Sequence, residues 1–182
     1  MTTALLIIDI QNDYFPGGAM ELCGAEEAGR AAASLLTLFR GAGLPVLHVQ
    51  HNSVRPEAGF LLPGTSGAEI HHLVTPREGE AVVLKNFPNS FRGTVLQQLL
   101  KDRGVDRLVV CGMMTHMCVD TTVRAGFDLG YRIILAHDGC ATRALSFGER
   151  ETPAELVQGA YMAALGAVFA RVAASSEIAG LL

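Results

Sequence analysis

Three residues of different chemical type each follow a short apolar run in this sequence. Asp9 closes LLIID, Lys85 closes AVVLK, and Cys118 comes a few residues after RLVVCG, at the start of an expected helix. An acid, a cation and a thiol brought together are the parts of covalent catalysis, in which a base activates a nucleophile and a third group orients or charges the pair. These three residues are therefore the first candidates for catalysis.

Each of the three also has an ordinary structural interpretation. N–H groups at a helix start lower the pKa of a thiol and can receive an oxyanion, but Cys118 could equally be a small buried hydrophobic side chain. Asp9 is expected to be partly desolvated, which suits acid–base work, or it could cap the next turn. Lys85 could simply be solvated. It is the combination that favours catalysis.

The composition limits the class of protein. The chain has 182 residues, of which 49% are hydrophobic and 18% charged, with a net charge of −4. We expect one folded domain over residues 1–182, and no nucleic-acid partner because no basic stripe is present. The first residues carry no cationic segment and no apolar run long enough to span a membrane, so a cytoplasmic protein without a membrane partner is expected. Cys23, Cys111 and Cys140 lie in no CxxC pair and are interpreted as structural or uninformative.

Strand patterns alternate with helical patterns along the chain. This alternation predicts a mostly parallel sheet with helices on both faces, in which ligands bind beyond the carboxyl ends of the strands. Thr94 and Gly104 are expected to flank one helix as N-cap and C′ residues, and Pro153 to be the first residue of another after a Thr152 cap. The expected strands are 4–9, 44–50, 81–85, 107–112, 131–138 and 168–175, and the expected helices 24–43, 94–104, 118–130 and 152–167. A short helix or tail should end the chain.

Residues 53–80 connect two expected strands without a convincing helix. A connection of this length in a compact domain is commonly functional, so the segment is predicted to form a lid or a pocket wall near the site. The alternative is a surface crossover with one helical turn near residues 68–73.

The sequence as a whole resembles a known family, the isochorismatase-like cysteine hydrolases. The resemblance rests on LLIIDIQNDYF, on FPNSFRGTVLQQLL and above all on VVCGMMTHMCVDTTVRAGFDLGYRIILAHDGCAT. It implies a three-layer α-β-α, Rossmann-like fold around a six-stranded sheet and a catalytic triad of Asp9, Lys85 and Cys118. It also implies a cis peptide bond between Met113 and Met114, and an oxyanion hole formed by the backbone N–H groups of Met114 and Cys118.

Departures from the family pattern narrow the function. The nicotinamidase branch carries a metal-binding Asp-x-His after its second strand, whereas this chain has Gln50-His51-Asn52-Ser53 there. His71 and His72 are adjacent and poorly placed to chelate one ion. We therefore predict no metal and no cofactor, and nicotinamide becomes a less favoured substrate. Vinyl-ether hydrolysis of isochorismate is the weaker alternative, because true isochorismatases lack a cysteine at the position of Cys118.

The predicted function is hydrolysis of an amide, ureido or carbamoyl C–N bond of a small molecule through a thioester. A redox-active protein and a ligand-binding relative without activity are the alternatives from other classes. The few charges in AYMAALGA and VFARV predict a buried helix face and a homodimer or homotetramer. Eight residues are candidates for substrate binding: Phe15, Gln50, His51, Asn52, Phe60, Phe91, Thr115 and His116.

Overall fold

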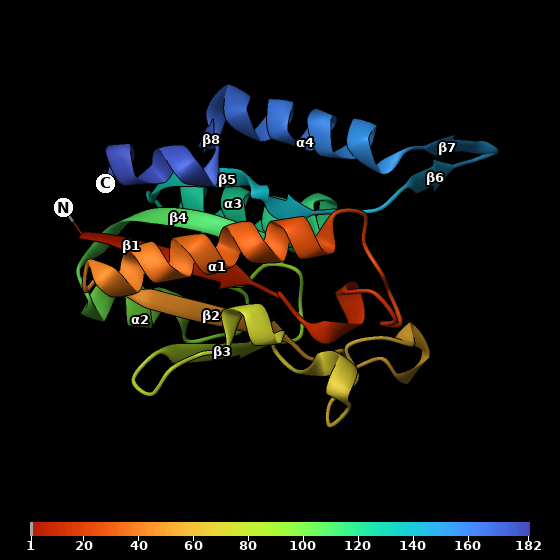
Figure 1. The fold of residues 1–182 in the computed structure, drawn as a ribbon, viewed down its shortest axis with the longest axis horizontal. Coiled ribbons are helices and arrows are strands. Elements are labelled where there is room, and N and C mark those ends of the chain that lie inside the picture. The colour runs from red at the N-terminus through yellow and green to blue at the C-terminus, as the bar shows by residue number, and fades with distance from the viewer. Residues whose placement is uncertain (1) are drawn as a thin grey trace.

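A six-stranded sheet runs through the middle of the protein, with helices on both faces (Figure 1). The computed structural model describes residues 2–182, and for Pro56 the backbone only. Every neighbouring pair of strands in this sheet is parallel. The strands lie in the order β3 (Ala81–Lys85), β2 (Val46–His51), β1 (Thr2–Ile8), β4 (Val105–Met113), β5 (Arg132–Ala141) and β8 (Arg171–Ala173).

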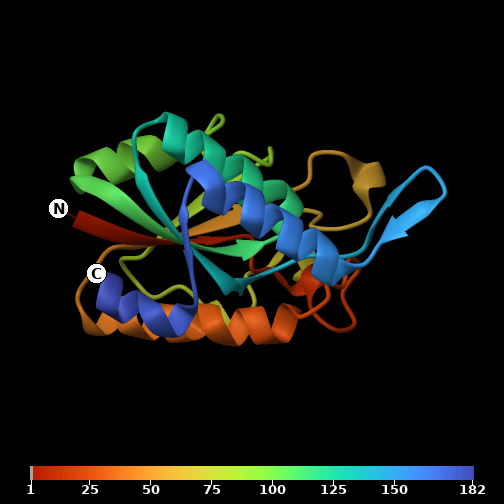
Figure 2. The ribbon, with the colours of Figure 1, turned by 90° about the horizontal axis from the view of Figure 1, so that it is seen from above.

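The helices are divided between the two faces of the sheet (Figure 2). One face is covered by α1 (Ala25–Gly41) and the C-terminal 3-10 helix η6 (Ser175–Leu181), and the other by α2 (Leu96–Asp102), α3 (Asp120–Asp128) and α4 (Ala154–Val168). Each face has its own apolar core, and alternate residues of β1, such as Ile7 and Ile8, belong to different cores. Burial on both faces explains why β1 is a continuous apolar run.

The strand order reverses its direction between β1 and β4. The chain builds outward from β1 to β2 and β3, and then returns to the other side of β1 with β4, β5 and β8. In sheets of this kind the ligand lies beyond the carboxyl ends of the two strands at the reversal. Asp9 directly follows β1, and the segment from Met114 to Cys118 directly follows β4. The topology therefore places Asp9 and the segment from Met114 to Cys118 where a ligand is expected to bind.

The predicted α/β architecture, with its six-stranded parallel sheet and helices on both faces, is confirmed. The helix boundaries differ in detail. α2 starts at Leu96 with Val95 as its N-cap, although the Thr94 hydroxyl accepts the Leu96 N–H at 3.3 Å, and Gly104 has the left-handed φ of +60° expected of a C′ residue. Pro153 is the N-cap of α4, and not its first residue, because its extended ψ of 151° places it outside the helix.

Two further differences concern the carboxyl ends of the strands. The turn before α3 is a π-helix, η5 (Thr115–Val119), so that Cys118 lies inside a helical turn and not at a helix start. A hairpin of β6 (Leu145–Phe147) and β7 (Arg150–Thr152) was not expected, and it projects from the body of the protein (Figures 1 and 2). Its strands are three residues each and mostly exposed, which leaves little apolar pattern in the sequence.

Residues 53–80 contain three short 3-10 turns and no longer helix: η2 (Pro56–Ala58), η3 (Ser66–Ala68) and η4 (His72–Val74). Buried side chains from the end of β1 hold this segment in place. Gln11 donates to the carbonyl groups of His51 and Ala68 and accepts the His51 N–H, while Asp13 accepts the Leu61 N–H at 2.6 Å. The segment is thereby fixed beside the carboxyl ends of β1 and β2.

Candidate active site

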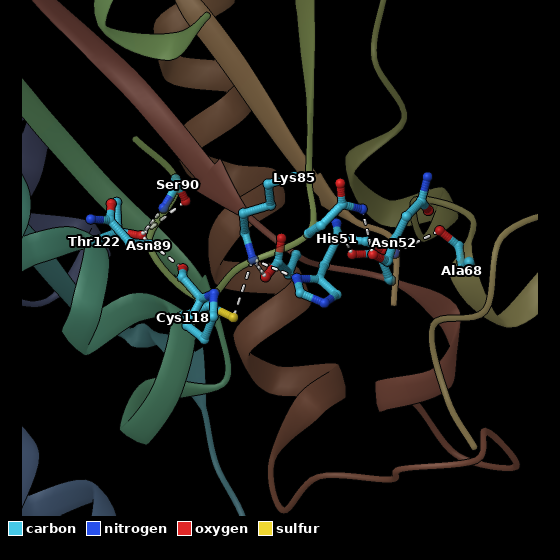
Figure 3. A network of polar contacts seen from close by, with 12 residues as sticks. His51, Asn52, Ala68, Lys85, Asn89, Ser90, Cys118 and Thr122 are labelled. Carbon is cyan, nitrogen blue, oxygen red and sulfur yellow. Dashed lines mark hydrogen bonds and ion pairs between the residues drawn. The ribbon is translucent and has the colours of Figure 1, made fainter. Parts of the chain in front are cut away.

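The ammonium group of Lys85 lies between the side chains that follow the neighbouring strands (Figure 3). Its Nζ is 2.6 Å from Asp9 Oδ2, 2.9 Å from His51 Nδ1 and 3.2 Å from Cys118 Sγ. The side chains of Lys85 and Asp9 are completely buried, and Cys118 is only 4% exposed. The structure therefore brings the acid, the cation and the thiol together in one water-poor site.

The backbone at the ends of β1 and β4 is unusual where it presents these groups. Asp9 has a left-handed φ of +50°, a conformation that few residues other than glycine adopt and that is often found at functional sites. Gly112 has a φ of +144°, and a Cβ on it would overlap the carbonyl oxygen of Ile8. The peptide bond between Met113 and Met114 is cis, as expected. The lack of a side chain at Gly112 lets β4 pass close to β1 just before the turn that carries Cys118.

The electrostatics of Cys118 differ from the expectation drawn from the sequence. Burial, followed by the negative charge of Asp9, raises the pKa of the Cys118 thiol, and the opposing effect of Lys85 is smaller. The expected lowering of the pKa by a helix start is therefore wrong, because the thiol lies inside the helical turn in a desolvated site. Burial also acts to lower the pKa of Lys85, but Asp9 and Cys118 outweigh it and raise that pKa. The resting site holds a thiol beside an ammonium–carboxylate pair.

Oδ1 is the oxygen of Asp9 that can take up a proton. Both carboxylate oxygens are buried without a hydrogen-bond partner within residues 2–182, but Oδ2 lies 2.6 Å from Lys85 Nζ in the ion pair, so Oδ1 is the one without a close charged neighbour. Asp9, His51 and Cys118 each place a potential ligand atom within 4.8 Å of the others. The carboxylate is thus near enough to the thiol to exchange a proton with small side-chain movements.

His51 completes the surroundings of Lys85. Burial, followed by the charge of Lys85, lowers the pKa of His51, so the imidazole is neutral. Because an ammonium can only donate, Nδ1 is the nitrogen that accepts from Lys85, and the ring proton is on Nε2. His51 therefore offers an N–H donor on the side of its ring opposite Lys85.

The same cluster is the one group in the described part of the chain that could hold a metal ion with three ligands of the His, Cys, Asp or Glu type. Carboxylate, imidazole and thiolate suit a cation such as Zn²⁺. The Lys85 ammonium lies among these three side chains and provides the positive charge there. Binding of a metal by all three would require Lys85 to leave.

A cavity of about 430 Å³ opens onto Cys118. Its buried end is formed by Tyr14, Met114 and Cys118, and its exposed rim includes Val54 and Arg55. The cavity has the size and the largely apolar lining of a small-molecule site. The remaining lining residues are His51, Ser53, Ala58, Phe60, Asn86, Phe87, Pro88 and Met117.

Of the eight residues predicted from the sequence to bind substrate, His51 and Phe60 line this cavity. The other six have structural contacts elsewhere. Two support the fold around residues 66–74, since Phe15 stacks on His71 at 3.5 Å between ring centroids and Gln50 donates to the Ala68 carbonyl. The backbone of Asn52 is bonded to the end of β3: its N–H donates to the backbone carbonyl of Lys85, and its carbonyl accepts from the side-chain amide of Asn86.

The remaining three are Phe91, Thr115 and His116, and each contacts a residue outside the cavity. Phe91 stacks on Tyr131 at 5.9 Å, and the Thr115 hydroxyl donates to the Ala141 carbonyl. His116 is hydrogen-bonded to Thr142 and lies edge-on to Tyr161 of α4. The pocket residues that sequence reasoning missed include Tyr14, Arg55, Phe87 and Met117. Met117 flanks Cys118 in the chain and Tyr14 follows the DIQND motif, so proximity to those motifs could have identified these two, but it gives no signal for Arg55 or Phe87.

The walls of the cavity are held by buried polar contacts. The Thr122 hydroxyl of α3 accepts the Ser90 N–H at 3.0 Å and donates to the Ser90 hydroxyl, which fixes the loop that carries Phe87 and Pro88 (Figure 3). On the opposite side the wall is formed by Ser53, Val54, Arg55, Ala58 and Phe60, so the first part of the 53–80 segment is the expected pocket wall, and residues 61–80 do not line the cavity. The cavity is therefore bounded by two loops anchored to different parts of the sheet.

Comparison with known proteins agrees with this geometry. Residues 3–173 match the Isochorismatase domain family. An uncharacterized isochorismatase family protein of Bacillus subtilis is 52% identical over 94% of this chain and 96% of its own length. Streptothricin hydrolase of Streptomyces noursei is 39% identical over 76% of this chain and 54% of its own length.

Solved structures show the same fold. A putative isochorismatase hydrolase from Oleispira antarctica has a TM-score of 0.95 at 49% identity, covering 98% of this chain and 96% of that one. N-carbamoylsarcosine amidase from Thermoplasma acidophilum has a TM-score of 0.83 at 27% identity, covering 97% and 98%. Within residues 2–182, no helix is long and apolar enough to cross a membrane.

Proposed function

The chain belongs to the isochorismatase family of hydrolases, and on that premise we propose that it is a metal-independent cysteine amidohydrolase of small molecules. The bond cleaved is an amide, ureido or carbamoyl C–N bond, and Cys118 is the nucleophile. Similarity to a protein named N-carbamoylsarcosine amidase supports this class of substrate. The observation that carries the proposal is the Lys85 ammonium held at 2.6 Å from Asp9 and 3.2 Å from Cys118, which lines the buried end of a largely apolar cavity.

The first half of the reaction forms a thioester. Because the pKa of the thiol is raised, Cys118 does not rest as a thiolate, and its proton passes to Asp9 as the sulfur attacks the substrate carbonyl carbon. The backbone N–H groups of Met114 and Cys118 receive the oxyanion. Asp9 then returns the proton to the leaving nitrogen, the C–N bond breaks, and ammonia or an amine departs.

The second half of the reaction is hydrolysis. A water molecule gives a proton to Asp9 and its oxygen attacks the thioester carbon. Collapse of the resulting intermediate breaks the C–S bond, Asp9 returns the proton to sulfur, and the carboxylic acid is released. Lys85 holds Asp9 and Cys118 together and compensates their charge throughout, in keeping with its ammonium state.

The proposal is tested by ammonia release from a panel of small amides, ureas and carbamoyl compounds. We expect release by the wild type to be lost in Cys118→Ala and in Asp9→Asn, and to be unchanged by a chelator. Hydroxylamine added during turnover should trap the acyl group as a hydroxamate, since it attacks a thioester and frees the thiol. Exposed Cys23 provides the matched control, because Cys23→Ala should retain activity.

The possible results separate the parts of the proposal. Ammonia release that persists in Cys118→Ala would contradict the nucleophile. Activity abolished by a chelator and restored by a metal ion would contradict metal independence. Silence of the wild type across the whole panel would contradict the amidohydrolase function.

A further inference from the structure

The charge distribution along the active-site cavity is uneven. At its buried end it is lined by the neutral thiol of Cys118 and the neutral imidazole of His51, and the charges of Asp9 and Lys85 behind them cancel. At its rim, Arg55 is the one charged residue among those that line the cavity. A bound molecule therefore meets a neutral interior and a positive entrance.

No acid is paired with Arg55, or with Arg92, which lies outside the lining but contacts the lining residue Phe87. Arg55 is exposed and forms no ion pair among the described residues, and neighbouring Glu57 is exposed and lines no part of the cavity. Arg92 lies over the ring of Phe87, a lining residue, at 3.8 Å from the ring centroid, and likewise has no acidic partner among them. The chain as a whole is acidic, with a net charge of −4, so an entrance without carboxylates departs from the average surface.

We propose that the substrate is an acylamide or carbamoyl compound with a short apolar body and a carboxylate at the end remote from the scissile bond, and that Arg55 binds this carboxylate. The inference rests on the amidohydrolase function proposed above. The uncharged C–N group fits the neutral end of the cavity beside Cys118, the body lies against Tyr14, Phe60 and Phe87, and the carboxylate reaches the rim. The guanidinium group matches a carboxylate in both charge and geometry.

Three compounds of equal chain length, each with its terminal group two methylenes from the amide carbon, test the charge preference: succinamate is anionic, butyramide is neutral and 3-aminopropanamide is cationic. Longer homologues of each, with one to three added methylene groups, find the length that reaches from Cys118 to the rim. At the best length we expect kcat/KM to be highest for the anion, about 2- to 5-fold above the neutral compound, because Arg55 is exposed and solvent screens its ion pair with a carboxylate. The cation should be the poorest of the three.

Substitutions assign the preference to one side chain. Arg55→Gln should raise KM for the anion and reduce the preference towards unity, and Arg55→Lys should keep part of it. Arg30→Gln is the matched control, since Arg30 is an exposed arginine of α1 paired with Glu26 and Glu27, and it should leave the preference unchanged. An anion preference that survives in Arg55→Gln, or a wild type that favours the neutral or cationic compound, would overturn the inference.

A binding measurement makes the result independent of turnover. The same compounds are titrated into Cys118→Ala, with and without Arg55→Gln, and followed by NMR chemical shifts. Tighter binding of the anion that depends on Arg55 supports the inference, and equal binding, or no binding of any compound, overturns it. Ammonia release by the wild type reports separately on the amidohydrolase function, so failure of one proposal can be told from failure of the other.

Discussion

Replacing Lys85 by methionine removes the ammonium from the centre of the site and nearly preserves the length of the side chain. Asp9 would then be a completely buried carboxylate without its ion-pair partner, because the wild-type structure gives Oδ1 no hydrogen bond within the described residues. Breaking a buried pair in this way costs about 3–5 kcal/mol of folding free energy. Since domains of this size have about 5–15 kcal/mol in total, Lys85→Met should be markedly destabilised.

The pH dependence identifies the cause of that loss. In the variant, Asp9 can avoid an unpaired charge by taking up a proton on folding, which is easier at low pH. The difference in unfolding free energy between wild type and Lys85→Met should therefore be larger at pH 8 than at pH 5.5. Replacing Asp9 by asparagine in the same chain removes the unpaired charge. The double variant should consequently lose less stability than the sum of the two single losses, by about 1–3 kcal/mol.

Urea unfolding followed by far-ultraviolet circular dichroism provides the measurement, because the chain contains no tryptophan for fluorescence. Lys101→Met is a matched control, since Lys101 is the other lysine in the chain and is exposed in the last turn of α2. It should change stability little at either pH. Additive losses for Asp9→Asn and Lys85→Met, or a pH-independent loss in Lys85→Met, would refute the reasoning that the pair is held as ions.

Three further predictions concern the rest of the fold. Arg40 first, with smaller contributions from the Arg77 N–H and His48, lowers the pKa of largely buried Glu80 from 4.5 to about 2. This carboxylate therefore contributes about 3 kcal/mol above pH 4.5 that is lost as the pH falls towards 2, and Glu80→Gln should lack that acid-dependent part in urea unfolding. Gly112→Ala should lower Tm by several degrees, because its Cβ would overlap the backbone at the end of β1, and an unchanged Tm would contradict this. Residues 156–168 of α4 carry no charge and are largely exposed, so we expect a homodimer or homotetramer by light scattering, with Ala163→Glu weakening it; a wild-type monomer would contradict this.

The parts of the structure that the sequence predicts are those that repeat a local pattern. β1 was located from an apolar run because both of its faces are buried, and α1 from its one apolar stripe. β3 was located from its β-branched run AVVLK, although Val82 and Leu84 on one of its faces are exposed. The strand ends then indicated Asp9, Lys85 and Cys118, since the carboxyl ends of parallel strands share one edge of a sheet. The β6–β7 hairpin was not predicted because it is exposed, with Phe147 93% accessible, and its sequence has no alternation of buried apolar and exposed polar residues.

The cavity wall could not be predicted in the same way. Its position depends on contacts between residues far apart in the chain, such as Gln11 with Ala68 and Asp13 with Leu61. Phe87 lines the cavity, whereas Phe91, only four positions later, packs against Tyr131, and nothing in the local sequence distinguishes these two roles. The raised pKa of Cys118 was missed for a related reason, because it follows from burial, which depends on the whole fold.

The surroundings of Lys85 also limit what the substrate can receive. An ammonium group has three donors, and Nζ already has three polar neighbours, in Asp9, His51 and Cys118, at 2.6–3.2 Å. A substrate atom could approach Nζ as closely only by displacing one of these neighbours. Under the proposed function, we therefore expect the proton for the leaving nitrogen to come from Asp9, and the oxyanion to be met by backbone N–H groups or by the Nε2 proton of His51. The distances around this one nitrogen atom support a division of tasks in which Lys85 fixes the charges and Asp9 moves the proton.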